Sequence, residues 1–333
     1  MRRYFIIVLA AFTAFLMVEL IVAEVVNFPR RPRGRLVVVS DKCGWYNNLS
    51  WEQPYTRYFN AEGGVIITQS NNIGLPGLDI ARTADSRYIF VLGSSFVEAR
   101  QVPSERIATS LFQAELQRHY PCYQVLNLGL SGADSYRCWF RSRFFESQFD
   151  PSCVILVIER LWDIELRRYQ RPLDFSLPLA FGMEARPSAL LAALRLMREK
   201  SAFVNALSQA FSEDIVGPVR VDDGDRQIAD GGVTRNERKV VSPELVTCLR
   251  AYKQRYGSRF VVVLMLPNEE EQDLLEETCR QLDIKTLCTI GIQRPENRFL
   301  GNGHLNETGN KKLGMALYDA FALFRENKDR RGQ

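Results

Sequence analysis

Residues 88–96 read Tyr-Ile-Phe-Val-Leu-Gly-Ser-Ser-Phe, an apolar run that ends in a small polar turn. A short apolar run followed by glycine and serine predicts a strand that is buried on both faces. Ser95 therefore comes just past a buried strand, where a turn would present its hydroxyl. Such a hydroxyl becomes a nucleophile when a base lies beside it.

Further apolar runs follow at the intervals expected for strands that alternate with helices. They are Tyr123–Leu128, Cys153–Ile158, Arg259–Leu266 and the weaker Lys285–Ile290. Apolar residues at helical spacing predict helices around 107–116, over 135–149 and at 313–324. Continuous apolar strands separated by helices indicate a parallel sheet covered on both faces. The predicted fold is an α/β, three-layer, flavodoxin-like parallel sheet, in which sites form at the carboxyl ends of the strands.

The composition excludes several classes of protein. The 333 residues are 46% hydrophobic and 25% charged, which is typical of a globular chain and not of a disordered one. The formal net charge of +4 is too small to indicate a nucleic-acid partner. No phosphate loop, dinucleotide fingerprint or metal-ligand spacing is present, so no cofactor and no metal are expected. Of the seven cysteines, Cys279 and Cys288 could pair if the body is exported, and the sequence leaves this open.

The N-terminus contains an apolar stretch, Tyr4–Val26, interrupted only by Glu19 and Glu24. At 1.5 Å per residue its length suffices to cross the hydrocarbon core of a bilayer. We therefore predict an uncleaved transmembrane helix within an anchor at residues 1–28, with a cleaved signal peptide as the alternative. Arginines lie on both sides of the stretch, and their count alone would place the body in the cytoplasm.

The remaining chain divides into a lead-in segment and a main domain. Residues 29–86 are mixed in character and are expected to pack on the main domain at 87–326. Residues 165–242 interrupt the alternation of strands and helices with a helical stretch and a polar, glycine-rich loop. This insertion is either a cap over the site or a surface elaboration.

A second candidate residue lies near the other end of the chain. Gly303-His304-Leu305-Asn306 precedes the closing helix and holds one of only two histidines. An imidazole is the usual base for a serine nucleophile, and such partners are often far apart in sequence. Taken singly, Ser95 also fits a plain turn serine and His304 a residue that starts a helix. The other histidine, His119, ends a predicted helix, where a cationic side chain favours the helix dipole.

Four motifs in order resemble those of the SGNH (GDSL-type) hydrolase superfamily, in particular its bacterial membrane-anchored members. Val91–Ala99 lines up with LGDSFxxG, and Asn71–Gly77 with the upstream N-x-x-G-x-x-G. Asn127–Gly132 keeps N-x-G-x-x-G intact, and Asn302–Gly309 resembles DGHLNxxG. The resemblance runs from about residue 70 to 325 and leaves the insertion unmatched.

The resemblance implies roles for three residues. Ser95 matches the nucleophile, His304 matches the general base, and the N–H groups of Ser95 and Gly132 match two donors of the oxyanion hole. The implied activity is that of a serine esterase or acyltransferase acting on acyl esters, such as acetyl esters, of a cell-envelope glycan. The same resemblance implies a single-pass inner-membrane protein with an extracytoplasmic, periplasmic body, against the arginine count.

The sequence departs from the family pattern at positions that support catalysis. Ser94 stands where the family has aspartate, and Ala99 where it has glycine. Trp162 replaces the asparagine of the oxyanion hole, although Asp163 keeps its place. Asn302 stands where an aspartate normally orients the histidine, which leaves Asn302 and Asp163 as possible orienting residues.

These departures keep a second interpretation open. Loss of a side-chain donor from an oxyanion hole costs roughly two to three orders of magnitude in rate, and loss of the orienting acid up to about 10⁴-fold. Glu159, Asp163 or Glu307 are candidates to substitute for the acid. The alternative is a catalytically degenerate SGNH domain that binds glycan or a membrane complex without turnover.

Overall fold

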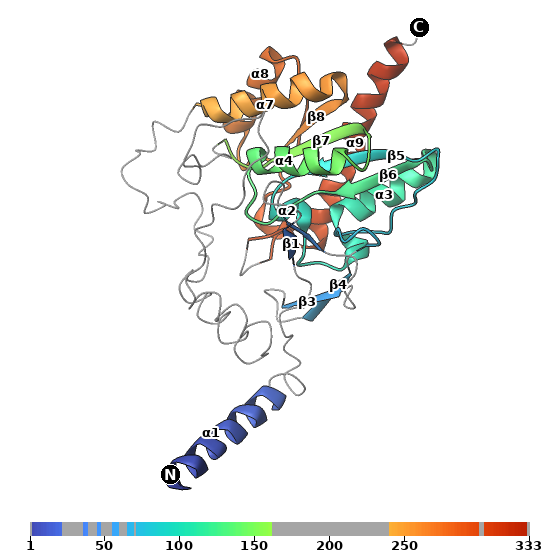
Figure 1. The fold of residues 1–333 in the computed structure, drawn as a ribbon. Helices are drawn as coiled ribbons and strands as arrows, with labels where there is room; N and C mark the ends of the chain where they lie inside the picture. The colour runs from blue at the N-terminus through green and yellow to red at the C-terminus, as the bar shows by residue number, and fades with distance from the viewer. Residues whose placement is uncertain are drawn as a thin grey trace.

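The computed structural model describes part of the chain (Figure 1). The described backbone comprises residues 2–21, 36–38, 45–47, 55–59, 65–69, 71–161, 240–299 and 303–331. Side chains are described for residues 10–21, 71–161, 240–299 and 303–326.

A five-stranded, wholly parallel sheet forms the centre of the described fold (Figure 1). Its strands are β5 (Arg87–Leu92), β6 (Tyr123–Asn127), β7 (Pro151–Ile158), β8 (Phe260–Leu264) and β9 (Lys285–Cys288). Their order across the sheet is β6-β5-β7-β8-β9, so the second strand in sequence lies outside the first. This is the flavodoxin-like order, and it confirms the predicted fold.

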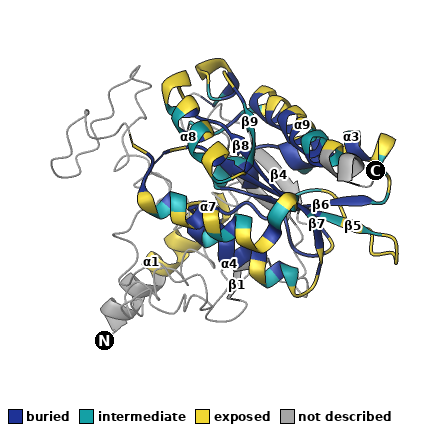
Figure 2. Cartoon of the chain, turned by 90° about the horizontal axis from the view of Figure 1, so that it is seen from above, coloured by how far each residue is buried: buried dark blue, intermediate teal, exposed yellow. Residues whose placement is uncertain are grey.

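Helices cover both faces of this sheet (Figure 2). One face packs against α3 (Ala108–His119) and α9 (Glu307–Arg331). The other packs against α4 (Ser135–Glu146), α7 (Pro243–Tyr256) and α8 (Glu269–Gln281). Every residue from Ile89 to Leu92 is consequently buried, because successive side chains of a strand point to opposite faces. That burial explains why the strand is an unbroken apolar run in the sequence.

Strand ends differ from the prediction by a few residues, for local reasons. The predicted strand Arg259–Leu266 contracts to β8 because Gly257–Arg259 forms a 3₁₀ turn before it. The predicted strand Lys285–Ile290 stops at Cys288. There the N–H and the hydroxyl of Thr289 both donate to the carbonyl of Leu264, which ends the ladder.

The end of the lead-in segment is built into the core. Ile73, Leu75 and Ile80 are buried in the cluster that lies under α4 and α7. Further upstream, β1 (Leu36–Val38) pairs antiparallel with β2 (Trp45–Asn47), and β3 (Tyr55–Phe59) with β4 (Val65–Gln69). Most of the predicted insertion at 165–242, including the helical stretch expected there, lies outside the described residues.

The predicted membrane-spanning segment overlaps α1 (Arg2–Leu20). Searching the described residues, we find no helix that is both long enough and apolar enough to cross a bilayer. The side chains of residues 1–9 and 22–26, at the two ends of the predicted span, are not among those described.

Cys279 and Cys288 are free thiols and form no disulfide in the structure. Burial, together with the hydrogen bond of 3.1 Å that the thiol donates to Glu276, raises the pKa of Cys288 to about 11. At pH 8 a thiol with this pKa is about 0.1% thiolate, against about a quarter for an ordinary cysteine. We therefore expect iodoacetamide to alkylate Cys288 about 100-fold more slowly in the native chain than in urea.

Peptide mass spectrometry over a time course measures this rate. The matched control is Cys288→Ser, which should lack the corresponding modified peptide and leave the other sites unchanged. Equal rates in native and unfolded chains, or a mass two hydrogens lower for the linked peptides, would contradict the expectation.

Candidate functional site

Ser95 is the first residue of α2 (Ser95–Glu98), a single helical turn directly after β5. Gly93 makes this turn possible, since a Cβ there would lie only 2.5 Å from Val97 Cγ2. Ser94 caps the helix by accepting a hydrogen bond of 3.3 Å from the Phe96 N–H. The strand, the glycine and the cap together hold Ser95 at the carboxyl edge of the sheet.

The turn ends at Ala99, where the family pattern has glycine. Its φ of 50° lies in the left-handed region, which costs a non-glycine residue roughly 1–2 kcal/mol. The Ala99 side chain is buried with Val102, Ile107 and Phe299. Burial of the methyl group offsets part of this cost, which accounts for alanine at this position.

His304 is held by the loop that precedes α9. The Phe299 N–H donates to the His304 carbonyl at 2.8 Å. Their neighbours Arg298 and Leu305 pair as an isolated antiparallel β-bridge. Asn306 then caps α9 by accepting from the Gly309 N–H at 3.0 Å. The Gly-His-Leu-Asn motif is thus a positioned histidine followed by a helix cap.

The fold brings the two predicted residues together. Ser95 Oγ and His304 Nε2 lie 2.9 Å apart, although they are 209 residues apart in sequence. Both side chains are half-buried, and the ring of Phe96 lies beside the imidazole with centroids 5.7 Å apart. This is hydrogen-bond distance, the geometry that lets an imidazole take a proton from a serine hydroxyl.

The loop containing Gly132 lies against the turn that carries Ser95. Asn127 donates to the Val97 carbonyl at 2.8 Å and accepts from the Gly129 N–H at 2.9 Å. The Leu130 N–H donates to the Gly93 carbonyl at 3.0 Å, so contacts reach the chain on both sides of Ser95. Gly132 has a φ of 70°, and a Cβ built there would meet nothing within 4 Å in the part of the chain that the structure describes. Gly132 is exposed.

The upstream motif Asn71–Gly77 has a structural role in this fold. The Asn71 side chain accepts from the N–H groups of Ile73 and Leu75 at 3.1 and 2.9 Å. Gly74 and Gly77 have φ values of 78° and 117°, which favour glycine. The motif therefore forms a compact turn.

Asn302 and Asp163, the two possible orienting residues, lie outside the described residues, as does Trp162. Glu307, a candidate substitute for the missing acid, is exposed and forms an ion pair with Arg106. Glu159 is buried at the end of β7 and accepts a hydrogen bond from the Ser94 hydroxyl.

Two charged groups lie near the turn that carries Ser95: Glu159, which was predicted as a candidate substitute for the acid, and Arg298, which was not predicted there. Glu159 contacts the turn through Ser94, and the guanidinium of Arg298 lies 5.6 Å from the ring centroid of Phe96. Burial lowers the pKa of Arg298, while the negative charge of Glu159 opposes that shift. The sequence signals for these residues are a carboxylate at a strand end and a basic residue before the Gly-His-Leu-Asn motif, and both patterns are common.

The described part of the chain contains no cluster of side chains that could bind a metal ion. Over those residues no group of three or more His, Cys, Asp or Glu side chains is close enough to hold an ion.

Comparison with known proteins places this site in context. No family model matches the sequence, and no curated protein matches it either. Solved structures do match, among them the psychrotrophic esterase EstA from Pseudoalteromonas sp., at 10% identity and a TM-score of 0.41. That match covers 72% of this chain and all of the esterase.

Two other structures match over a similar stretch. AlinE4, an SGNH-hydrolase family esterase, has 13% identity and a TM-score of 0.35, with 72% of this chain and 97% of that chain covered. A two-domain esterase active on acetylated mannans has 10% identity and a TM-score of 0.38, with 72% of this chain and 49% of that chain covered. The chain is thus similar, at low identity, to solved esterases of the SGNH/GDSL type.

Proposed function

We propose that the chain cleaves or transfers acyl esters through a covalent intermediate on Ser95, with His304 as general base. The observation that supports this most strongly is the 2.9 Å contact between Ser95 Oγ and His304 Nε2. The dyad lies at the carboxyl edge of a parallel sheet, where α/β proteins of this kind place their sites.

The proposed chemistry needs only these two side chains and the substrates. His304 Nε2 accepts the hydroxyl proton while Ser95 Oγ bonds to the carbonyl carbon and the C=O electron pair moves to oxygen. The carbonyl re-forms, the bond to the leaving alcohol breaks, and His304 gives that alcohol its proton. Water or a sugar hydroxyl then loses a proton to His304 and attacks the acyl group. Ser95 leaves and recovers its proton from His304.

The N–H groups of Ser95 and Gly132 are the proposed donors to the developing oxyanion. The first N–H groups of a helix have no partner within that helix. The N–H groups of Phe96, Val97 and Glu98 all bond to Ser94, whereas that of Ser95 has no acceptor within the described parts of the chain. It is therefore available to a carbonyl oxygen bound at the nucleophile.

A fluorophosphonate probe tests the proposal on the purified full chain. We expect labelling of the wild type and none of Ser95→Ala or His304→Ala, because the probe reacts only with an activated serine. A well-folded wild type that does not label would overturn the proposed activity and favour a glycan-binding protein without turnover.

For the substrate we propose acyl esters, such as acetyl esters, of a bacterial cell-envelope glycan. This substrate class is what the resemblance to the SGNH family implies. Release of acetate from an acetylated oligosaccharide, compared with the same oligosaccharide after chemical deacetylation, tests it. Cleavage of small activated esters without any acetate release would reject the glycan and retain the esterase.

We further propose that Tyr4–Val26 anchors the chain in the inner membrane with the body in the periplasm. The apolar length of the segment supports the anchor, and Arg2 and Arg3 before it support a cytoplasmic N-terminus. The arginines that follow the segment oppose a periplasmic body, which rests on the family resemblance. Fusion of the C-terminus to alkaline phosphatase, or to a fluorescent protein active in the cytoplasm, distinguishes the two sides. Fluorescence without phosphatase activity would reject a periplasmic body.

A further inference from the structure

A buried carboxylate connects the turn that carries Ser95 to the loop that carries Gly132. Glu98, the last residue of α2, is only 2% exposed. Its Oε2 accepts from the Ser131 N–H at 2.8 Å and from the Ser131 hydroxyl. Its Oε1 forms an ion pair with Arg100. One side chain thus links Ser131 to the turn of the proposed nucleophile.

Burying a carboxylate is costly unless it is paired and hydrogen-bonded, and hydrogen bonds to a charged group are stronger than neutral ones. The surroundings of Glu98 meet both conditions. The negative charge of Glu98 also acts on Arg141. Burial lowers the pKa of Arg141 to about 10, and the charge of Glu98 opposes that shift. The carboxylate is therefore paired with Arg100 through Oε1 while it accepts from Ser131 through Oε2.

The loop also fits closely against α2. A Cβ on Gly129 would lie 2.3 Å from the Glu98 nitrogen and 2.7 Å from the Val97 carbonyl carbon. Gly132, in contrast, is exposed and has a left-handed backbone. The loop is therefore fixed at Gly129 and exposed at Gly132, and Ser131 lies just before the exposed end.

We infer that Glu98 is a positioning residue for the oxyanion hole. Fixing Ser131 fixes the peptide unit that carries the Gly132 N–H. Because Glu98 is in the same helical turn as Ser95, one carboxylate sets the two proposed donors relative to each other. This inference rests on the proposed function, since it assigns Glu98 a task in the same site.

The test is Glu98→Gln in the purified full chain. The amide offers one acceptor oxygen, so it cannot bind both Ser131 donors and Arg100 as the carboxylate does. We expect kcat on p-nitrophenyl acetate to fall about 10- to 100-fold with KM within about twofold, since a donor displaced by about 1 Å costs about 10²-fold. The fluorophosphonate reaction rate should fall in parallel, because its transition state places negative charge in the same hole.

Two further variants make the result specific. Glu115→Gln removes an equivalent carboxylate from an exposed pair on α3 and should leave kcat unchanged. Ser131→Ala keeps the pair between Glu98 and Arg100 and removes one donor at an exposed position, so it should fold and lower kcat severalfold at constant KM.

A folded Glu98→Gln with wild-type kcat and labelling rate, or a Ser131→Ala chain with unchanged kcat, would overturn the inference while the esterase proposal stands. A wild type that neither labels nor turns over would overturn the proposed function and the inference with it.

Discussion

Replacing Ser95 by alanine is expected to lower kcat on p-nitrophenyl acetate by at least about 10⁴-fold, and His304→Ala is expected to do the same. The two side chains share one hydrogen bond of 2.9 Å, so neither performs the first step without the other. A serine without its base is a weak nucleophile at neutral pH, and a base without its serine has no proton to take. Steady-state kinetics on the purified full chain measures both losses.

The double variant makes this prediction sharper. Because the residues act as one unit, Ser95→Ala combined with His304→Ala should be no slower than either single variant. The chain offers matched controls in His119→Ala, which removes the other histidine, and Ser147→Ala at an exposed helix end. Both controls should stay within about twofold of wild type. Losses that multiply in the double variant would show that the two residues do not work as a dyad.

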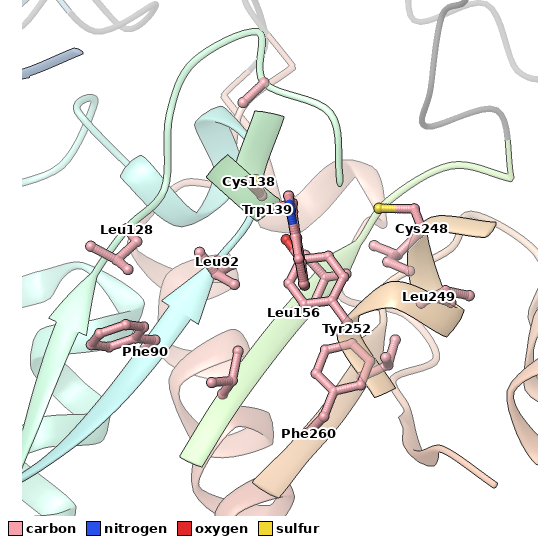
Figure 3. Packing of buried hydrophobic residues seen from close by; sticks show 14 of the residues in the cluster. Phe90, Leu92, Leu128, Cys138, Trp139, Leu156, Cys248, Leu249, Tyr252 and Phe260 are labelled. Carbon is pink, nitrogen blue, oxygen red and sulfur yellow. The ribbon is translucent and has the colours of Figure 1, made fainter. Parts of the chain in front are cut away.

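Replacing Tyr252 by alanine is expected to lower the free energy of unfolding by about 4 kcal/mol. The side chain is fully buried on α7, where its ring stacks on Phe260 at 4.9 Å and meets Trp139 edge to face at 5.1 Å (Figure 3). Its hydroxyl donates to the Ser135 carbonyl at 3.1 Å, at the start of α4. The truncation therefore leaves a cavity between two helices and the sheet and removes the hydrogen bond to the Ser135 carbonyl.

Urea unfolding followed by circular dichroism measures this loss, and Tyr252→Phe is the matched control. Phenylalanine keeps both ring contacts and removes one buried hydrogen bond, so its expected cost is about 1 kcal/mol. Equal losses for the two variants would show that the hydroxyl, and not the ring packing, carries the stability of this cluster.

The strands and the dyad could be predicted because their signals are local. A strand buried on both faces is an unbroken apolar run, and Ser95 and His304 each lie next to such a run or a helix start. The contact between Glu98 and Ser131 could not be predicted in this way. It depends on how the turn after β5 packs against the loop after β6. The spacing of apolar residues in the sequence carries no information about that packing. Ser94 and Glu159 are a second example, because either residue alone fits an ordinary strand end.

The position of the dyad in the chain has a consequence for biosynthesis. The serine follows the first strand of the sheet, whereas the histidine precedes the last helix, which packs against α3 through the hydrogen bond from the Ala108 N–H to Asn310. A nascent polypeptide that has folded everything up to β9 therefore holds a serine without a base. On the proposed mechanism, acyl transfer therefore begins only after α9 has left the ribosome and packed against α3.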